Sequence, residues 1–147
     1  MSDIHPGYSL HDGPPSVADY MRLRHEAGLT PKSEEQARAG IHGAWAAVHV
    51  VHDESGATVG MGRVIGDGGW YFHVIDMAVL PDHQHRGLGT SVLEHLLNTV
   101  EQKAPPGAFL SLLADEPGQA LYARYGFRDL APRTVGMSQV LKSRPRG

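Results

Sequence analysis

The segment Pro81–Thr90, PDHQHRGLGT, carries the residues best suited to bind a phosphate. It joins an apolar stretch to an amphipathic one, so a helix is expected to begin inside it. Gly87 and Gly89 remove side chains where backbone N–H groups converge, and the helix dipole adds partial positive charge. Arg86 adds a full charge. The pattern predicts a cradle for a phosphate or pyrophosphate, unless the two glycines serve only the geometry of the turn.

Other phosphate-binding motifs fit this sequence poorly. A P-loop requires Gly-Lys-Ser/Thr, and no Gly-Lys pair occurs in the chain. The run Gly60–Ile65, GMGRVI, begins like a dinucleotide fingerprint, but its third glycine position is Ile65 and no helix is predicted to follow. We therefore expect Gly60 and Gly62 to be strand residues that another backbone or a ligand approaches closely.

The elements that must position this segment are predicted from periodicity and from Pro and Gly punctuation. A first helix is expected at Ser16–Glu26, and a second opens within residues 30–35. Two more are expected, one between Pro81 and Pro105 and one at Pro117–Tyr125. Strands are expected at Tyr8–Leu10, Trp45–His52, Ala57–Ile65, Trp70–Leu80, Phe109–Ala114 and Thr134–Leu141. The order βααβββαβαβ predicts an α+β (mixed α/β) fold, a mixed sheet with helices packed against it.

Composition limits the class of protein. A chain of 147 residues is expected to form one domain, 1–147. The absence of cysteine excludes disulfides and thiolate chemistry, and a net charge of −3 gives no sign of a nucleic-acid partner. No apolar run is long enough to span a membrane and no signal peptide is recognisable, so a cytoplasmic location is expected.

Two motifs in this order resemble the GNAT-type N-acetyltransferases. Residues 84–89, QHRGLG, match the family signature Gln/Arg-x-x-Gly-x-Gly/Ala, and a predicted strand ending in AVLP precedes them. Residues 120–127, ALYARYGF, are similar to the LYxxxGF segment of the family. The resemblance is strong over about residues 45–127 and weak before them.

This resemblance implies a GNAT-like, mostly antiparallel sheet and an acetyl group moved from acetyl-CoA to a primary amine. The acceptor would be a small molecule or a peptide, attacking directly in a ternary complex. Backbone groups of Met77, Ala78 and Val79 would pair with the pantetheine arm. The loop would hold the pyrophosphate through Gln84, His85, Arg86, Gly87, Leu88, Gly89 and Thr90.

The resemblance also places Tyr122 near the departing sulfur, as general acid to the CoA thiolate; the alternative is a core aromatic. Asp76, in the middle of a strand, must have a partner or a task, either as base or water-orienting group or in a structural hydrogen bond. His73, three residues away, would face the opposite side of an unbroken strand, and a bulge would change that. Candidates for the acceptor pocket are Tyr20, Arg22, Arg24, Trp70 and Tyr71.

Three positions depart from the family pattern. Asp115 stands where Asn is frequent, Gly118 where Ala is frequent, and His85 where Gly or a basic residue is usual. The first of these keeps a second function open, that of a catalytically silent CoA-binding regulatory module. The ten histidines show no zinc-like spacing, so no metal is expected. A homodimer is left open.

Overall fold

The computed structural model describes residues 3–142, which fold as two compact units. Along the chain, the first unit ends at Leu112 and the second begins at Leu113. The first unit holds a five-stranded sheet in the order β1-β2-β3-β4-β5. Its strands are β1 (Tyr8–Asp12), β2 (Ala46–His52), β3 (Thr58–Gly66), β4 (Tyr71–Val79) and β5 (Phe109–Leu112). Neighbours are antiparallel except β4 and β5, which run parallel and are connected by a helical crossover.

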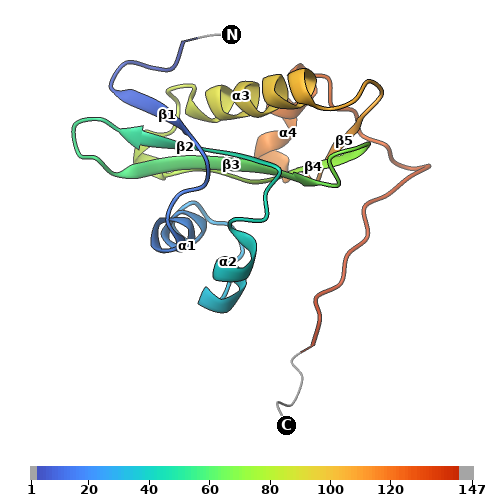
Figure 1. Ribbon diagram of the computed structural model, residues 1–147, viewed down its shortest axis with the longest axis horizontal. Coiled ribbons are helices and arrows are strands. Elements are labelled where there is room, and N and C mark those ends of the chain that lie inside the picture. Colours follow the sequence, from blue (N-terminus) through green and yellow to red (C-terminus); the bar gives the residue numbers. More distant parts are fainter. Residues whose placement is uncertain (1–2, 143–147) are drawn as a thin grey trace. The chain divides into compact units, whose positions relative to one another are not determined.

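Helices cover both faces of this sheet (Figure 1). Helices α1 (Val17–Glu26) and α2 (Glu34–Gly40) lie on one face, and α3 (Leu88–Lys103) lies on the other. A short 3-10 helix, η1 (Pro81–His83), connects β4 to the loop before α3. One apolar stripe of α3 is buried and forms part of the core of the unit: Leu88, Val92, Leu96 and Val100.

Local signals fix the starts of the first two helices. Ser16 caps α1 by accepting a hydrogen bond from the amide of Asp19 at 3.1 Å. Ser33 and Gln36 form a reciprocal capping box at the start of α2. Side-chain oxygens at these positions satisfy amides that have no partner inside the helix. Both helices therefore begin where the sequence predicts.

The glycines of β3 stand at close approaches, as expected. A Cβ added to Gly62 would lie 2.6 Å from Sδ of Met77 and from Cγ1 of Val92. Side chains, rather than a backbone or a ligand, therefore occupy the space that this glycine leaves, and they pack between β3 and α3.

The second unit holds one regular element in its described residues, the helix α4 (Glu116–Arg124). The predicted strand at Thr134–Leu141 is wrong, because these residues form no ladder with any described strand. A period-2 pattern makes a strand only where a neighbouring edge supplies hydrogen bonds. Here the amide of Thr134 turns back instead, to the carbonyl of Leu130 at 3.0 Å.

Candidate active site

The loop before α3 has the geometry of an anion cradle. Gly87 is the N-cap of α3 and has a left-handed backbone, with φ of 73°, that favours glycine. Unlike α1 and α2, α3 has no side chain capping its first amides. The amides of Leu88, Gly89 and Thr90 belong to the first turn, which has no intrahelical acceptor, so they remain able to bind an external anion.

The other loop residues support this arrangement. The Gln84 side chain donates to the carbonyl of Val79 at 3.0 Å and so ties the loop to the end of β4. His85 has a φ of 65°, an uncommon backbone for a residue with a Cβ. The side chain of Leu88 is buried, so this residue can offer a ligand only its backbone.

Arg86 is held in place by a residue of β1. Its Nη1 donates to the hydroxyl of Tyr8, and that oxygen lies 2.7 Å from Nδ1 of His83. Burial lowers the pKa of His83, and the nearby His52 and Arg86 lower it further. The anchor of Arg86 is 78 positions away in the chain, so no local pattern could have indicated it.

Beyond its first four residues, β4 has an open edge. Its parallel pairing with β5 ends at Val74–Leu112, so Ile75–Val79 have no strand neighbour on that side among the described residues of the first unit. The predicted pantetheine segment, Met77, Ala78 and Val79, lies in this stretch. Its backbone can therefore pair with an extended ligand.

A bulge changes the side-chain pattern at the same place. Met61 pairs with Ala78 and Arg63 with Ile75, so Gly62 faces both Asp76 and Met77. Asp76 has a φ of 58°, which is left-handed for a strand residue. The bulge turns Asp76 to the same face as Ile75, and that face also carries His73. The strand is therefore not unbroken, and the bulge named as the alternative places His73 and Asp76 on the same face.

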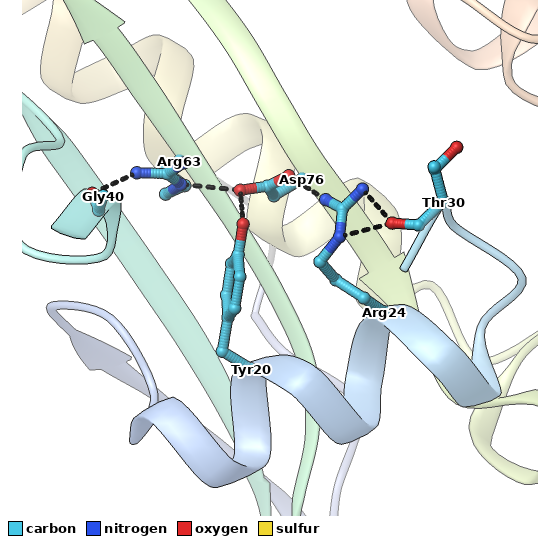
Figure 2. A network of polar contacts seen from close by, with 6 residues as sticks. All are labelled: Tyr20, Arg24, Thr30, Gly40, Arg63 and Asp76. Carbon is cyan, nitrogen blue, oxygen red and sulfur yellow. Dashed lines mark hydrogen bonds and ion pairs between the residues drawn. The ribbon is translucent and has the colours of Figure 1, made fainter. Parts of the chain in front are cut away.

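Asp76 is the centre of a buried polar network (Figure 2). Its Oδ2 accepts from Nε of Arg63 at 2.7 Å and from the Tyr20 hydroxyl at 2.7 Å, and its Oδ1 accepts from Nη1 of Arg24. The side chains of Arg24, Arg63 and Asp76 are 9%, 13% and 7% exposed. Burial, followed by the hydrogen bond to Asp76, raises the pKa of Tyr20, so that phenol stays protonated.

A cavity of about 340 Å³ opens beside this network. It lies among α1, α2, β3 and β4, and its lining includes Tyr20 and Arg24, two of the residues predicted for an acceptor pocket. The other three candidates, Arg22, Trp70 and Tyr71, are not part of the lining. Arg22 instead donates to the carbonyl of Thr58 at 2.8 Å, and both aromatic rings pack near Phe109.

Sequence reasoning did not foresee Arg63 or Lys32 in this cavity. A signal for Arg63 existed: it is a cation inside a strand of small apolar residues, and the next strand carries a lone carboxylate. A buried charge requires a partner, so this pair could have been proposed from the two strands alone.

The second unit places Tyr122 on α4, near the end of that helix. Burial, and then the charge of Asp115, raises the pKa of Tyr122. Asp115 is the N-cap residue of the helix. A Cβ on Gly118 would lie 2.9 Å from Cε2 of Tyr122, so the glycine leaves room for the ring. Both departures from the family pattern therefore act on Tyr122.

The described part of the chain holds neither a cluster of metal ligands nor a helix suited to a membrane. No group of three or more His, Cys, Asp or Glu side chains there could hold a metal ion. None of the described helices combines the length and apolarity that crossing a membrane requires.

Comparisons with known proteins show the family and the fold of this chain. Residues 44–129 match the model of the acetyltransferase (GNAT) domain. A probable acetyltransferase of unknown function from Staphylococcus aureus is 34% identical, with a TM-score of 0.86 over 91% of this chain and 99% of that chain.

More distant structures share the fold alone. A GNAT family acetyltransferase from Streptococcus pneumoniae is 22% identical, with a TM-score of 0.74 over 92% of this chain and 99% of that chain. The ribosomal-protein-S18-alanine N-acetyltransferase of Escherichia coli is 20% identical, with a TM-score of 0.68 over 84% of this chain and 80% of that chain. Among curated proteins, none matches the sequence significantly.

Proposed function

Since the chain belongs to the GNAT acetyltransferase family, and is therefore an acyltransferase, we propose that it moves an acetyl group from acetyl-CoA to a primary amine of a small molecule. The observation that carries this proposal is that the chain has both an uncapped start of α3 and an open edge of β4. The amides at the start of α3 suit a pyrophosphate, and Ile75–Val79 suit an extended arm. A small molecule fits the cavity of about 340 Å³ better than a folded protein does.

Acetyl-CoA supplies an activated thioester, and the chain's own residues bind and orient the reactants. In the proposed reaction the amine nitrogen bonds to the acetyl carbon while the carbon–sulfur bond breaks. One proton leaves the nitrogen for solvent, the thiolate takes one from the Tyr122 hydroxyl, and the Tyr122 phenolate regains its proton from solvent. The raised pKa of Tyr122 keeps this phenol protonated and able to donate.

Asp76 is proposed to position cations rather than to accept the proton of the amine. Each of its oxygens already accepts from a guanidinium, and one also accepts from Tyr20. Taking up a proton would remove charge-assisted hydrogen bonds from two buried arginines. The proton of the amine is therefore assigned to water at the cavity.

Release of CoA from acetyl-CoA, followed with a panel of amines, tests the proposal. Release of CoA that depends on one class of amine supports acetyl transfer. Kinetics in which both substrates must bind before either product leaves support direct transfer in a ternary complex. Binding of CoA without release by any amine would instead indicate the non-catalytic CoA-binding module.

A further inference from the structure

The cavity beside Asp76 has more positive than negative charge. It is lined by Arg24, Arg63 and Lys32, while Asp76 is the only acidic residue in the lining. One carboxylate can neutralise one of the two buried guanidiniums. The remaining contacts are with uncharged groups: Arg24 donates to the carbonyl of Thr30, and Arg63 donates to the carbonyl of Gly40.

The two arginines also keep donors that the protein does not use. A guanidinium has five N–H groups. Arg63 donates through Nε to Asp76 and through Nη1 to Gly40, and its Nη2 has no acceptor in the described residues. No fully buried side-chain nitrogen or oxygen among those residues lacks a partner, so this Nη2 is not completely buried.

Lys32 adds a cation that is free to meet a ligand. It lies on the connection between α1 and α2, is exposed, and makes no ion pair among the described residues. Glu34, two positions along, is engaged by Arg38 at 2.7 Å. The open side of the cavity is therefore cationic, like its interior.

From these contacts we infer that the acceptor is a small amine that also carries an oxyanion, a carboxylate or a phosphate, bound by Arg63 and Lys32. The inference rests on the proposed acetyl transfer and names the substrate class of that same site. The guanidinium of Arg63 keeps N–H groups that can donate to an oxygen of either anion. Cationic acceptors such as polyamines are disfavoured by like charge.

The same arrangement assists the chemistry. Cations near an ammonium group lower its pKa and favour the neutral amine, the form that attacks a thioester. The cavity is bounded by Ile75 and Asp76, which begin the open edge of β4. An acceptor anchored here by its anion would therefore have its nitrogen beside the proposed path of the pantetheine arm.

The test uses pairs of amines that differ only in the anion: O-phosphoethanolamine with ethanolamine, and phenylalanine with phenethylamine. We expect kcat/KM of the wild type to be about 10- to 100-fold higher for the anionic member of at least one pair. The pair that shows the preference distinguishes phosphate from carboxylate. An equal or higher value for the amine that lacks the anion, in both pairs, would overturn the inference and leave acetyl transfer intact.

Variants then locate the anion. Lys32→Gln, at an exposed position, and Arg63→Gln are each expected to raise KM for the amine with an anion about tenfold or more, and to change KM less for its partner without the anion. Arg38→Gln, an exposed α2 arginine outside the cavity, is the control. Circular dichroism and Tm report whether Arg63→Gln remains folded, and Lys32→Gln keeps the test valid if it does not. A preference for the anion that survives in both cavity variants would overturn the assignment.

Binding gives a readout that does not depend on turnover. O-phosphoethanolamine should raise Tm more than ethanolamine does in the wild type, and Lys32→Gln should reduce the difference. If no amine releases CoA, the proposed function fails, and this measurement alone decides whether the cavity binds an anion. The inference would then also be overturned if the two members of each pair raised Tm equally, that is, O-phosphoethanolamine and ethanolamine, and phenylalanine and phenethylamine.

Discussion

Nε of Arg63 on β3 donates to Oδ2 of Asp76 on β4 at 2.7 Å, at the point where the two strands lose their regular register. The contact joins a buried cation to a carboxylate that the bulge turns toward the cavity. Because Arg24 binds the other carboxylate oxygen, one side chain holds two guanidiniums in place.

Asp76→Asn should therefore destabilise the protein strongly. Arg24 and Arg63 would lose their only anionic partner among the described residues, and breaking a buried ion pair costs about 3–5 kcal/mol of unfolding free energy. Urea denaturation of the variant measures this loss. Glu34→Gln is the control, because its ion pair with Arg38 is exposed, and it should change stability by less than about 1 kcal/mol. A variant with native stability whose turnover no longer depends on pH would instead identify Asp76 as the base.

Gly89→Val should abolish tight binding of CoA while the fold is kept. A Cβ at this position would meet only Cγ2 of Val79, at 3.9 Å, so the protein itself has room for a side chain. A branched side chain beside the first amides of α3 would obstruct a phosphate approaching them. Calorimetric titration with CoA and far-UV circular dichroism measure the two properties. Gly89→Ala should have a smaller effect, and unchanged affinity in both variants would make the turn purely structural.

The cradle can also be tested without mutation. Acetyl-CoA should raise Tm by binding the folded state, dephospho-CoA should retain most of the shift, and pantetheine should retain little. The difference follows from the pyrophosphate, which pantetheine lacks and dephospho-CoA keeps. Equal stabilisation by pantetheine and CoA would place the binding energy elsewhere.

Tyr122→Phe should lower kcat by about 10²-fold, the lower end of what general acid–base groups contribute, because a thiolate is already a fair leaving group. The ring is kept, so Tm and the affinity for acetyl-CoA should change little. Steady-state kinetics with an acceptor whose chemical step limits turnover measure the effect. Tyr125→Phe, in the same unit, controls for loss of a phenol, and wild-type turnover of Tyr122→Phe would leave this residue a packing aromatic.

Tyr8→Phe should weaken the binding of CoA without lowering kcat. It removes the hydroxyl that accepts from Arg86 and contacts His83, while the buried ring remains. A freed Arg86 loses orientation toward the anion, and a hydrogen bond to a charged group is worth about 1.5–3 kcal/mol, so Kd should rise at least fivefold. Tyr71→Phe, with a ring that is 41% exposed, is the control. Equal Kd values for Tyr8→Phe and wild type would contradict the anchoring role.

Stability should rise with pH through the titration of His73. Burial lowers the pKa of this imidazole below 6.5 in the folded state, so the unfolded chain binds more protons between that lowered value and 6.5. The free energy of unfolding is therefore lower on the acidic side of this window and higher above it. His73→Asn should reduce the slope relative to wild type, as measured by urea denaturation at a series of pH values. An identical slope in both proteins would show that other groups cause the dependence.

The starts of the helices and the phosphate loop were predictable because their determinants are local. A serine cap and a glycine N-cap each act on amides within three residues of themselves. Periodicity likewise determined the five strands of the first unit, since an apolar face must be buried wherever it occurs. The same reasoning failed for Thr134–Leu141, because pairing needs an edge from elsewhere in the chain, and a pattern of side chains does not supply one.

Apart from Arg63, which the two strands could have suggested, the surroundings of Asp76 were decided by tertiary structure. Its partners Arg63, Arg24 and Tyr20 are 13, 52 and 56 positions away. The residue types made a partner for this carboxylate necessary, because an isolated buried charge is too costly. Which partners it has depends on a one-residue bulge in β4 and on the packing of α1 across the sheet, and these arise from contacts between distant segments that no local pattern encodes.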